Sequence, residues 1–224
     1  MKYIQKGNTP KALTKYKDTT PGATFESAPK AEIRIGLLDE QGWLCAYCMR
    51  RISDKRNPKL AKYRTEVEHF KSQYRHPKLE LNYKNMLGVC NGNADNEHQL
   101  VCGKSKSKFD RTHDMFVNPL ELLRIKQIFY TTDGEILSDN EQIMHDLDII
   151  LNLNEPNLVE RRLQLYEETR KKIRKIRRSL WDKPQTKKLE LEKLKSAWEK
   201  RYENKFRPLC RVPLYLIEKE LTKL

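Results

Sequence analysis

The chain has 224 residues, which suits one medium-sized domain or a small core with a helical extension. Hydrophobic residues make up 38% of it and charged residues 34%, a charged share above the usual level of about 25%. This composition argues against one large apolar core. It favours a small, cross-linked core joined to long solvated helices.

The 45 Lys and Arg residues outnumber the 31 Asp and Glu residues, which gives a net charge of +14. Such a balance favours a polyanionic partner such as nucleic acid, although a soluble basic protein without such a partner is the plain alternative. No apolar run approaches the roughly 18 residues of a membrane span, and the N-terminus has no secretory pattern. We therefore expect a soluble cytoplasmic protein with reduced thiols.

Residues 1–29 are polar and interrupted by turn-forming pairs such as Thr9-Pro10 and Pro21-Gly22, so we expect a loosely ordered N-terminal arm. The next segment, Lys30–Glu40, has apolar residues at helical spacing. It predicts a helix that ends at Gln41-Gly42.

Cys45 and Cys48 form a CxxC pair, which fits either a metal-binding knuckle or a redox motif. The polar, arginine-containing segment that follows favours metal, because a redox CxxC opens a helix after a buried strand. A second pair, Cys90 and Cys102, can complete a tetrahedron. Four thiolates make a closed structural zinc site, so the sequence predicts bound Zn²⁺. The fifth cysteine, Cys210, has no partner and reads as a small buried hydrophobic residue.

Polar residues with catalytic potential lie between the two cysteine pairs. A short predicted strand over 65–70 carries Glu68 and His69, and Asn85 precedes an apolar run that ends at Cys90. A neutral imidazole can act as a general base, and carboxylate and amide oxygens suit Mg²⁺ or Mn²⁺. Neighbours on a strand point to opposite faces, so Glu68 and His69 share a site only if the strand ends or bends there. A purely structural role for His69 is the alternative.

In this order the residues resemble the HNH endonuclease superfamily with its ββα-metal core: CxxC, an acidic residue with His, Asn before a Cys, and a last Cys with Lys104 nearby. The resemblance is closer to the PtuB-like HNH subunits of Septu-type anti-phage systems, some of which accompany retrons. Segments such as Phe116–Leu120 and Leu151–Asn154 support it, and it covers roughly residues 30–165.

The resemblance implies a metal-dependent nuclease of DNA, or of RNA including tRNA, in which His69 activates water. Glu68 and Asn85 would hold or orient a catalytic Mg²⁺ or Mn²⁺, and the four cysteines would bind zinc. It also implies gating by an ABC-type, PtuA-like ATPase partner. The sequence departs from the family after its last cysteine, where Gly103 replaces the usual His or Asn ligand. Substitute ligands would come from Asn91, Asn93, Asp95 or Asp110.

Beyond Pro119 the pattern becomes helical. Residues 129–137 predict a hairpin with an Asp133-Gly134 turn, followed by helices over 140–151 and from about 155 to 180. A return helix that includes Leu191, Trp198 and Tyr202, and a last helix over 214–224, complete a helical hairpin. Residues 161–178 hold nine Lys or Arg and two Glu. From this region we select candidate phosphate contacts in addition to Lys104: Arg170, Lys171, Arg174 and Arg177.

The sequence thus predicts an α+β chain: a zinc-stapled ββα-metal (HNH) core at 30–120 and a helical region at 121–224 that contacts partner and phosphate. Trp181, Trp198 and Leu214–Ile217 are candidate partner-binding residues. His76, His98, His113 and His145 are further candidate site residues. Two rival interpretations remain: a non-catalytic nucleic-acid-binding zinc module, and an interaction subunit whose zinc knuckle only docks a partner.

Overall fold

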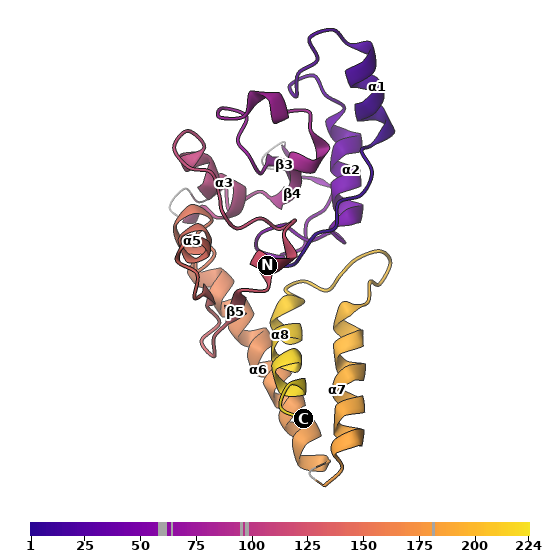
Figure 1. Ribbon diagram of the computed structural model, residues 1–224, viewed down its shortest axis with the longest axis vertical. Helices are drawn as coiled ribbons and strands as arrows, with labels where there is room; N and C mark the ends of the chain where they lie inside the picture. The colour runs from indigo at the N-terminus through magenta and orange to yellow at the C-terminus, as the bar shows by residue number, and fades with distance from the viewer. Residues whose placement is uncertain (58–61, 64, 95, 97–98, 181) are drawn as a thin grey trace.

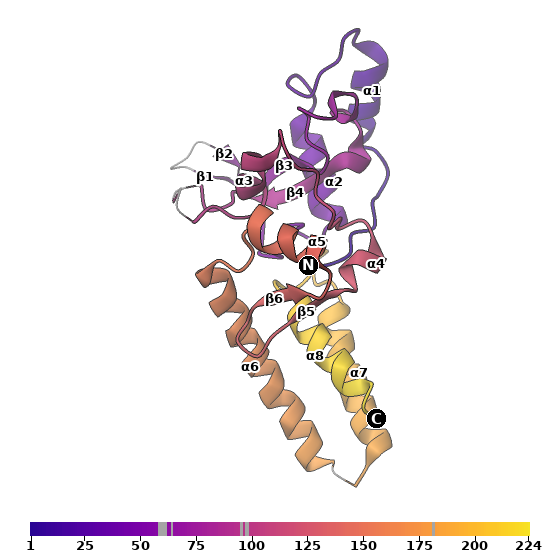
Figure 2. The same cartoon turned by 60° about the vertical axis from the view of Figure 1, so that its left-hand side comes forward.

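The computed structural model describes residues 1–57, 62–63, 65–94, 96, 99–180 and 182–224 of the chain. It is a mixed α+β structure with an elongated shape (Figure 1). The N-terminal half, with the sheet that carries the predicted site, occupies one end, and three C-terminal helices occupy the other (Figures 1 and 2).

The N-terminal half is built around one antiparallel hairpin, β3 (Thr65–His69) with β4 (Met86–Cys90). Short single-turn 3₁₀ segments at Pro77–Leu79 and Tyr83–Asn85 lie between these strands, and another follows at Ser107–Phe109. The remaining elements of this half are α1 (Lys11–Thr19), α2 (Lys30–Glu40), the strands β1 (Arg56–Asn57) and β2 (Lys62–Tyr63), and α3 (Cys102–Lys106).

The C-terminal half begins with α4 (Leu122–Ile125) and the hairpin of β5 (Ile128–Tyr130) with β6 (Ile136–Ser138). Then come α5 (Glu141–His145), a π-helical turn η5 (Asp146–Ile150), α6 (Pro156–Ser179), α7 (Pro184–Glu199) and α8 (Arg211–Leu221). α8 packs against both α6 and α7. No helix in the described part of the chain combines the length and apolar character that a membrane crossing requires.

Helix α2 covers one face of the β3–β4 hairpin. All five residues of β4 are buried, and Leu37 of α2 contacts the strand at Gly88. The amide of Gln41, which follows α2, accepts a hydrogen bond from Gly88 N and donates one to Gly88 O, both at 2.7 Å. Gln41 thereby pairs with the backbone N–H and C=O of Gly88 in the middle of β4, and it fixes the helix on the sheet.

The prediction of a loosely ordered arm at residues 1–29 is wrong. Residues 11–19 form α1, and Met1, Ile4 and Leu13 are buried. Ile4 N donates to Pro119 O at 2.9 Å, so the first residues lie between the two halves of the molecule, as Figure 1 also shows. Turn residues interrupt the segment as predicted, but its few apolar side chains suffice to anchor it.

The other predicted elements agree well with the structure. The helix at Lys30–Glu40, the strand through Glu68 and His69, the hairpin predicted at 129–137 and the helix that starts near Pro156 are confirmed. At Gly134 the hairpin turn has φ of 86°, and a Cβ there would lie 2.4 Å from Val159 O of α6. Glycine is therefore required both by the backbone conformation and by the close approach of α6.

Two predictions about the C-terminal helices need correction. α7 ends at Glu199, and Tyr202 lies outside it with 79% of its surface exposed. Trp198, Leu214 and Ile217 pack inside the core, where they hold α7 and α8 in place, so they do not offer a partner surface. Trp181 lies outside the described residues.

Candidate metal centre and candidate active site

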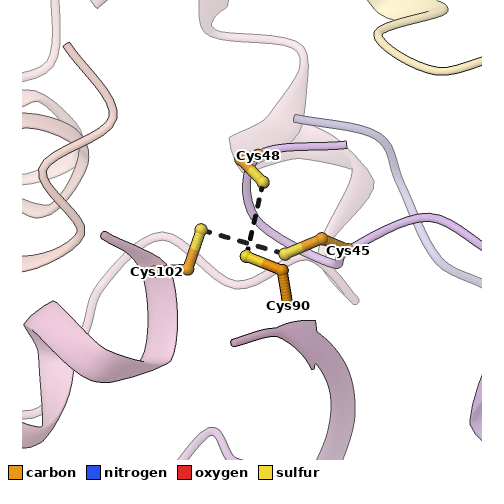
Figure 3. A group of neighbouring side chains, drawn as sticks. All are labelled: Cys45, Cys48, Cys90 and Cys102. Atoms are coloured by element: carbon orange, nitrogen blue, oxygen red, sulfur yellow. Dashed lines mark hydrogen bonds between the residues drawn. The ribbon is translucent and has the colours of Figure 1, made fainter. Parts of the chain in front are cut away.

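The four predicted cysteine ligands come together from three separate elements (Figure 3). Cys45 and Cys48 lie in the turn after α2, Cys90 ends β4 and Cys102 starts α3. The turn is closed by hydrogen bonds from Cys45 N to Arg50 O and from Met49 N to Cys45 O. Its left-handed residue Met49, with φ of 59°, lets the chain reverse immediately after Cys48.

The spacing of the sulfur atoms matches a tetrahedral metal centre. The Sγ atoms of Cys45 and Cys102 are 3.8 Å apart, as are those of Cys48 and Cys90, and all four lie within 4.8 Å of one another. Zinc–sulfur bonds of about 2.3 Å give a tetrahedron edge of about 3.8 Å, whereas a disulfide would need about 2.05 Å. The four buried thiols could therefore hold an ion such as Zn²⁺ in a closed site.

Arg50 supplies a positive charge next to this cluster. Its Nε donates to Cys48 Sγ and its Nη2 to Cys90 Sγ, both at 3.4 Å, and Nη1 donates to Asn93 Oδ1 at 3.0 Å. Four thiolates around a dication carry a net charge of −2, so the half-buried guanidinium of Arg50 partly compensates the centre. Burial alone would raise the pKa of the Cys48 thiol, but hydrogen bonds from the other cysteines and the charge of Arg50 lower this pKa.

His69 is the last residue of β3, and its ring lies against Phe25 and the carbonyl of Glu80. The ring centroids of His69 and Phe25 are 4.5 Å apart with an edge-on geometry, and His69 Nε2 lies 2.9 Å from Glu80 O. A carbonyl oxygen only accepts, so Nε2 carries the proton and Nδ1 keeps a free lone pair. Burial lowers the pKa of His69 despite the opposing hydrogen bond to Glu80, so the ring is neutral at pH 7.

Asn85 fixes the segment that carries this carbonyl. Its Oδ1 accepts from Lys71 N at 2.8 Å, and its Nδ2 donates to Lys71 O at 2.9 Å and to Leu79 O at 3.4 Å. The amide thus joins the two ends of the 71–79 segment, directly before Glu80. In this structure Asn85 positions the partner of His69.

Glu68 points to the opposite face of β3, toward α3. Its Oε1 lies 2.8 Å from Lys106 Nζ, which also donates to Asp110 Oδ1 at 2.8 Å and to His69 O at 3.0 Å. All three donors of this buried ammonium group are used. A Cβ on Gly103 would lie 2.8 Å from Glu68 Oε2, so the glycine after the last cysteine makes room for the Glu68 carboxylate.

The predicted divalent-metal ligands therefore do not form a ligand set among the described residues. The amide of Asn85 is bonded to backbone groups, and Glu68 is paired with Lys106. Of the substitutes, Asn93 bonds to Arg50, Asp110 pairs with Lys106, and Asp95 lies outside the described residues. These side chains do not fit a magnesium site without rearrangement.

The predicted phosphate contacts are scattered over the molecule. Lys104 pairs with Glu66 at 2.9 Å, Arg170 with Glu167 at 3.0 Å and Arg177 with Glu220 at 3.3 Å. Lys171 and Arg174 are exposed on α6. Together with Lys175, Arg178 and Ser179 they line a surface hollow of about 530 Å³ near the end of this helix.

The structure also defines residues that sequence reasoning missed or left unassigned. Arg50 and Lys106 were not assigned a role, although Lys106 lies one helical turn after Cys102 and so on the same face of α3. His76 pairs with Asp114 at 2.9 Å, and His98 lies outside the described residues. His113 and His145 lie close to Asp146. No protein-family model and no curated protein matches this chain, so its function has to be inferred from these residues.

Proposed function

We propose that this protein hydrolyses phosphodiester bonds in nucleic acid as an HNH-type endonuclease, with Nδ1 of His69 as the base that activates water. The observation that carries the proposal is the hydrogen bond from His69 Nε2 to Glu80 O. It selects the tautomer with an unprotonated Nδ1, and the lowered pKa keeps that nitrogen unprotonated at neutral pH, as a general base must be.

The arrangement of the elements around His69 supports this proposal. The base lies at the end of a two-stranded antiparallel hairpin, and α3 follows that hairpin in sequence. Cys90 of β4 and Cys102 of α3 belong to the same cluster, so a bound metal would hold strand and helix together. This order of hairpin, cysteine cluster and helix is what the HNH resemblance implies.

The positive charge next to His69 comes from the ammonium group of Lys106. Lys106 Nζ bonds to the backbone carbonyl of His69, and its positive charge helps to keep the imidazole neutral. A divalent cation, which the resemblance implies, would have to displace this ammonium group before it could bind Glu68. The proposed role of His69 does not depend on that step.

Access to the base requires a local movement, and this supports gating by a partner. His69 is 7% exposed, and Phe25 covers one side of it. Phe25 itself is fixed by a hydrogen bond from its backbone N to Glu80 Oε2 at 3.0 Å. We propose that a partner protein, for which the resemblance suggests an ABC-type ATPase, displaces the segment around Phe25 and exposes His69.

The proposal is tested by cleavage of plasmid DNA and of total RNA by the purified chain, alone and with a PtuA-like ATPase of the kind that the resemblance implies. Wild type is compared with His69→Ala and with His76→Ala, a matched control whose ring also bonds a neighbouring group but lies outside the site. We expect cleavage to be lost in His69→Ala and kept in His76→Ala. Zinc content, measured in parallel, stays equal in all three proteins.

Equal cleavage by wild type and His69→Ala would refute the assignment of the base. Absence of cleavage under all of these conditions would favour a binding module, and one observation already points that way. Four exposed cations at positions 171, 174, 175 and 178 share one face of α6, at spacings of three and four residues. Such a face binds phosphate without any catalytic residue.

A further inference from the structure

A second group of metal-ligating side chains lies apart from the cysteine cluster. The imidazoles of His113 and His145 and the carboxylate of Asp146 have donor atoms within 4.8 Å of one another. They line a cavity of about 440 Å³, with Lys71, Phe116 and Arg124 on its other sides. No step of the proposed hydrolysis uses these residues.

The buried carboxylate of Asp146 is held in a fixed orientation. Asp146 is 0% exposed, and its Oδ2 accepts hydrogen bonds from the backbone N–H groups of Phe116 at 2.5 Å and Val117 at 2.7 Å. These bonds leave Oδ1 for the two imidazoles. A buried carboxylate needs a compensating charge, and the nearest cations of the cavity are already engaged: Arg124 pairs with Glu121, and Lys71 lies 3.8 Å from Asp114.

The distances suit a metal ion with nitrogen and oxygen ligands. His113 Nε2 is 2.8 Å and His145 Nδ1 is 3.9 Å from Asp146 Oδ1. Bonds of about 2.0–2.1 Å to one ion place neighbouring donors about 2.9 Å apart in an octahedron and about 3.4 Å apart in a tetrahedron. The observed pair of distances brackets this range, so a small rotation of the half-exposed His145 ring would complete the site.

The backbone explains how two consecutive residues reach one site. His145 ends α5, and Asp146 begins the π-helical turn η5. In a continuous α-helix, adjacent side chains diverge by about 100°. Single π-helical turns change this angle locally, and they recur at functional sites. The side chains of His145 and Asp146 here face the same cavity, as does His113 from a segment 32 positions earlier.

We propose that His113, His145 and Asp146 bind a divalent first-row transition-metal ion at a second, open metal site. Two imidazoles and one carboxylate favour ions such as Zn²⁺, Co²⁺ or Mn²⁺. The side chains of His113 and His145 are 33% and 49% exposed, which leaves coordination positions open toward the cavity for water or an anionic ligand. The cysteine cluster, in contrast, is closed on all sides.

The test is metal stoichiometry, measured by native mass spectrometry and by absorption of the protein titrated with Co²⁺. Wild type is expected to bind two ions: one with the intense thiolate-to-metal absorption of the cysteine cluster, and a weaker one without it. His145→Ala should lose the second ion and keep the first. His113→Ala should do the same, but this change also removes a hydrogen-bond partner of the buried Asp146 and can destabilise the fold. The more exposed His145 is therefore the better position for the test.

His76→Ala is the matched control, since this ring also contacts a carboxylate, Asp114 Oδ2 at 2.9 Å, but belongs to no group of three ligating side chains among the described residues. It should still bind two ions. One ion per wild-type chain, or a second ion that His145→Ala retains, would overturn the proposal. His113 and Asp146 would then form only a structural hydrogen bond. Both readouts are independent of nucleic-acid cleavage, so the proposed function can fail without affecting this result.

Discussion

Replacement of Asn85 separates a positioning role from a metal-ligand role for this residue. Asn85→Ala removes three hydrogen bonds and leaves the N–H and C=O groups of Lys71 without these partners. Each buried polar group left unpaired costs about 1–3 kcal/mol, and the partial exposure of Lys71 reduces this cost. We therefore expect a loss of about 2–4 kcal/mol in the free energy of unfolding, which corresponds to a decrease in Tm of about 5–15 °C.

Asn85→Asp gives the sharper comparison, because the two roles predict opposite results. Aspartate retains an oxygen that accepts from Lys71 N, but it places its second oxygen where Nδ2 now lies, 2.9 Å from Lys71 O. Repulsion between these oxygens destabilises the charged form, so the variant should be less stable than wild type at pH 7. The difference in stability from wild type should shrink at low pH, where the carboxyl group is protonated. A metal ligand would instead gain affinity from the extra charge.

Urea denaturation at pH 7 and pH 4, with and without Mg²⁺, measures these differences. The position of His69 can be followed in the same variants by the NMR signals of its ring nitrogens, because the proton on Nε2 depends on Glu80. A loss below about 0.5 kcal/mol in Asn85→Ala would refute the reasoning, given typical hydrogen-bond energies. So would an Asn85→Asp protein that is as stable as wild type at pH 7 and is stabilised further by Mg²⁺.

Three further predictions concern pH, zinc and charge. The pKa of His69 is lower in the folded protein than in the unfolded chain, so the free energy of unfolding should fall as pH decreases below about 6.5. In His69→Gln, whose side chain can still donate to Glu80 O, chemical denaturation should show a smaller fall in this free energy. Arg50→Ala should speed the release of zinc to a chromogenic chelator about tenfold or more, and unchanged release would contradict its proposed support of the thiolates. Replacement of Lys171 and Arg174 by Glu should weaken nucleic-acid binding and reduce its salt dependence in fluorescence anisotropy, whereas unchanged binding would exclude this face of α6 as a phosphate contact.

The sequence predicted the elements that depend on local patterns. The CxxC spacing, the helical periodicity of Lys30–Glu40 and the Asp133-Gly134 turn are each encoded within a dozen residues, and each appears in the structure. The convergence of Cys90 and Cys102 with the first pair was also predictable, because two cysteine pairs in one short stretch are typical of a four-thiolate zinc site.

The contacts that define the candidate site could not be predicted, because they depend on tertiary packing. Nothing in the pattern around Lys106 indicates that its ammonium group bonds to Glu68 and to the carbonyl of His69. The order of residues 1–29 was missed for a related reason: their polar average hides four apolar side chains, those of Met1, Ile4, Leu13 and Ala28, whose burial depends on surfaces supplied by other segments. The convergence of His145 and Asp146 on one cavity likewise depends on a π-helical turn that no sequence signal marks.

The chain that follows α7 has a mechanical consequence for the cysteine knuckle. It runs back to the turn before β1, where Phe206 N bonds to Gly42 O at 3.0 Å and Leu209 N bonds to Met49 O at 3.1 Å. α6 and α7 project away from this point as a long arm (Figure 2). A torque applied at the far end of the arm would be carried through these two bonds to both sides of the Cys45–Cys48 turn. A force applied at the distant end of α6 and α7 would therefore act on the geometry of the cysteine knuckle, far from the point where it is applied.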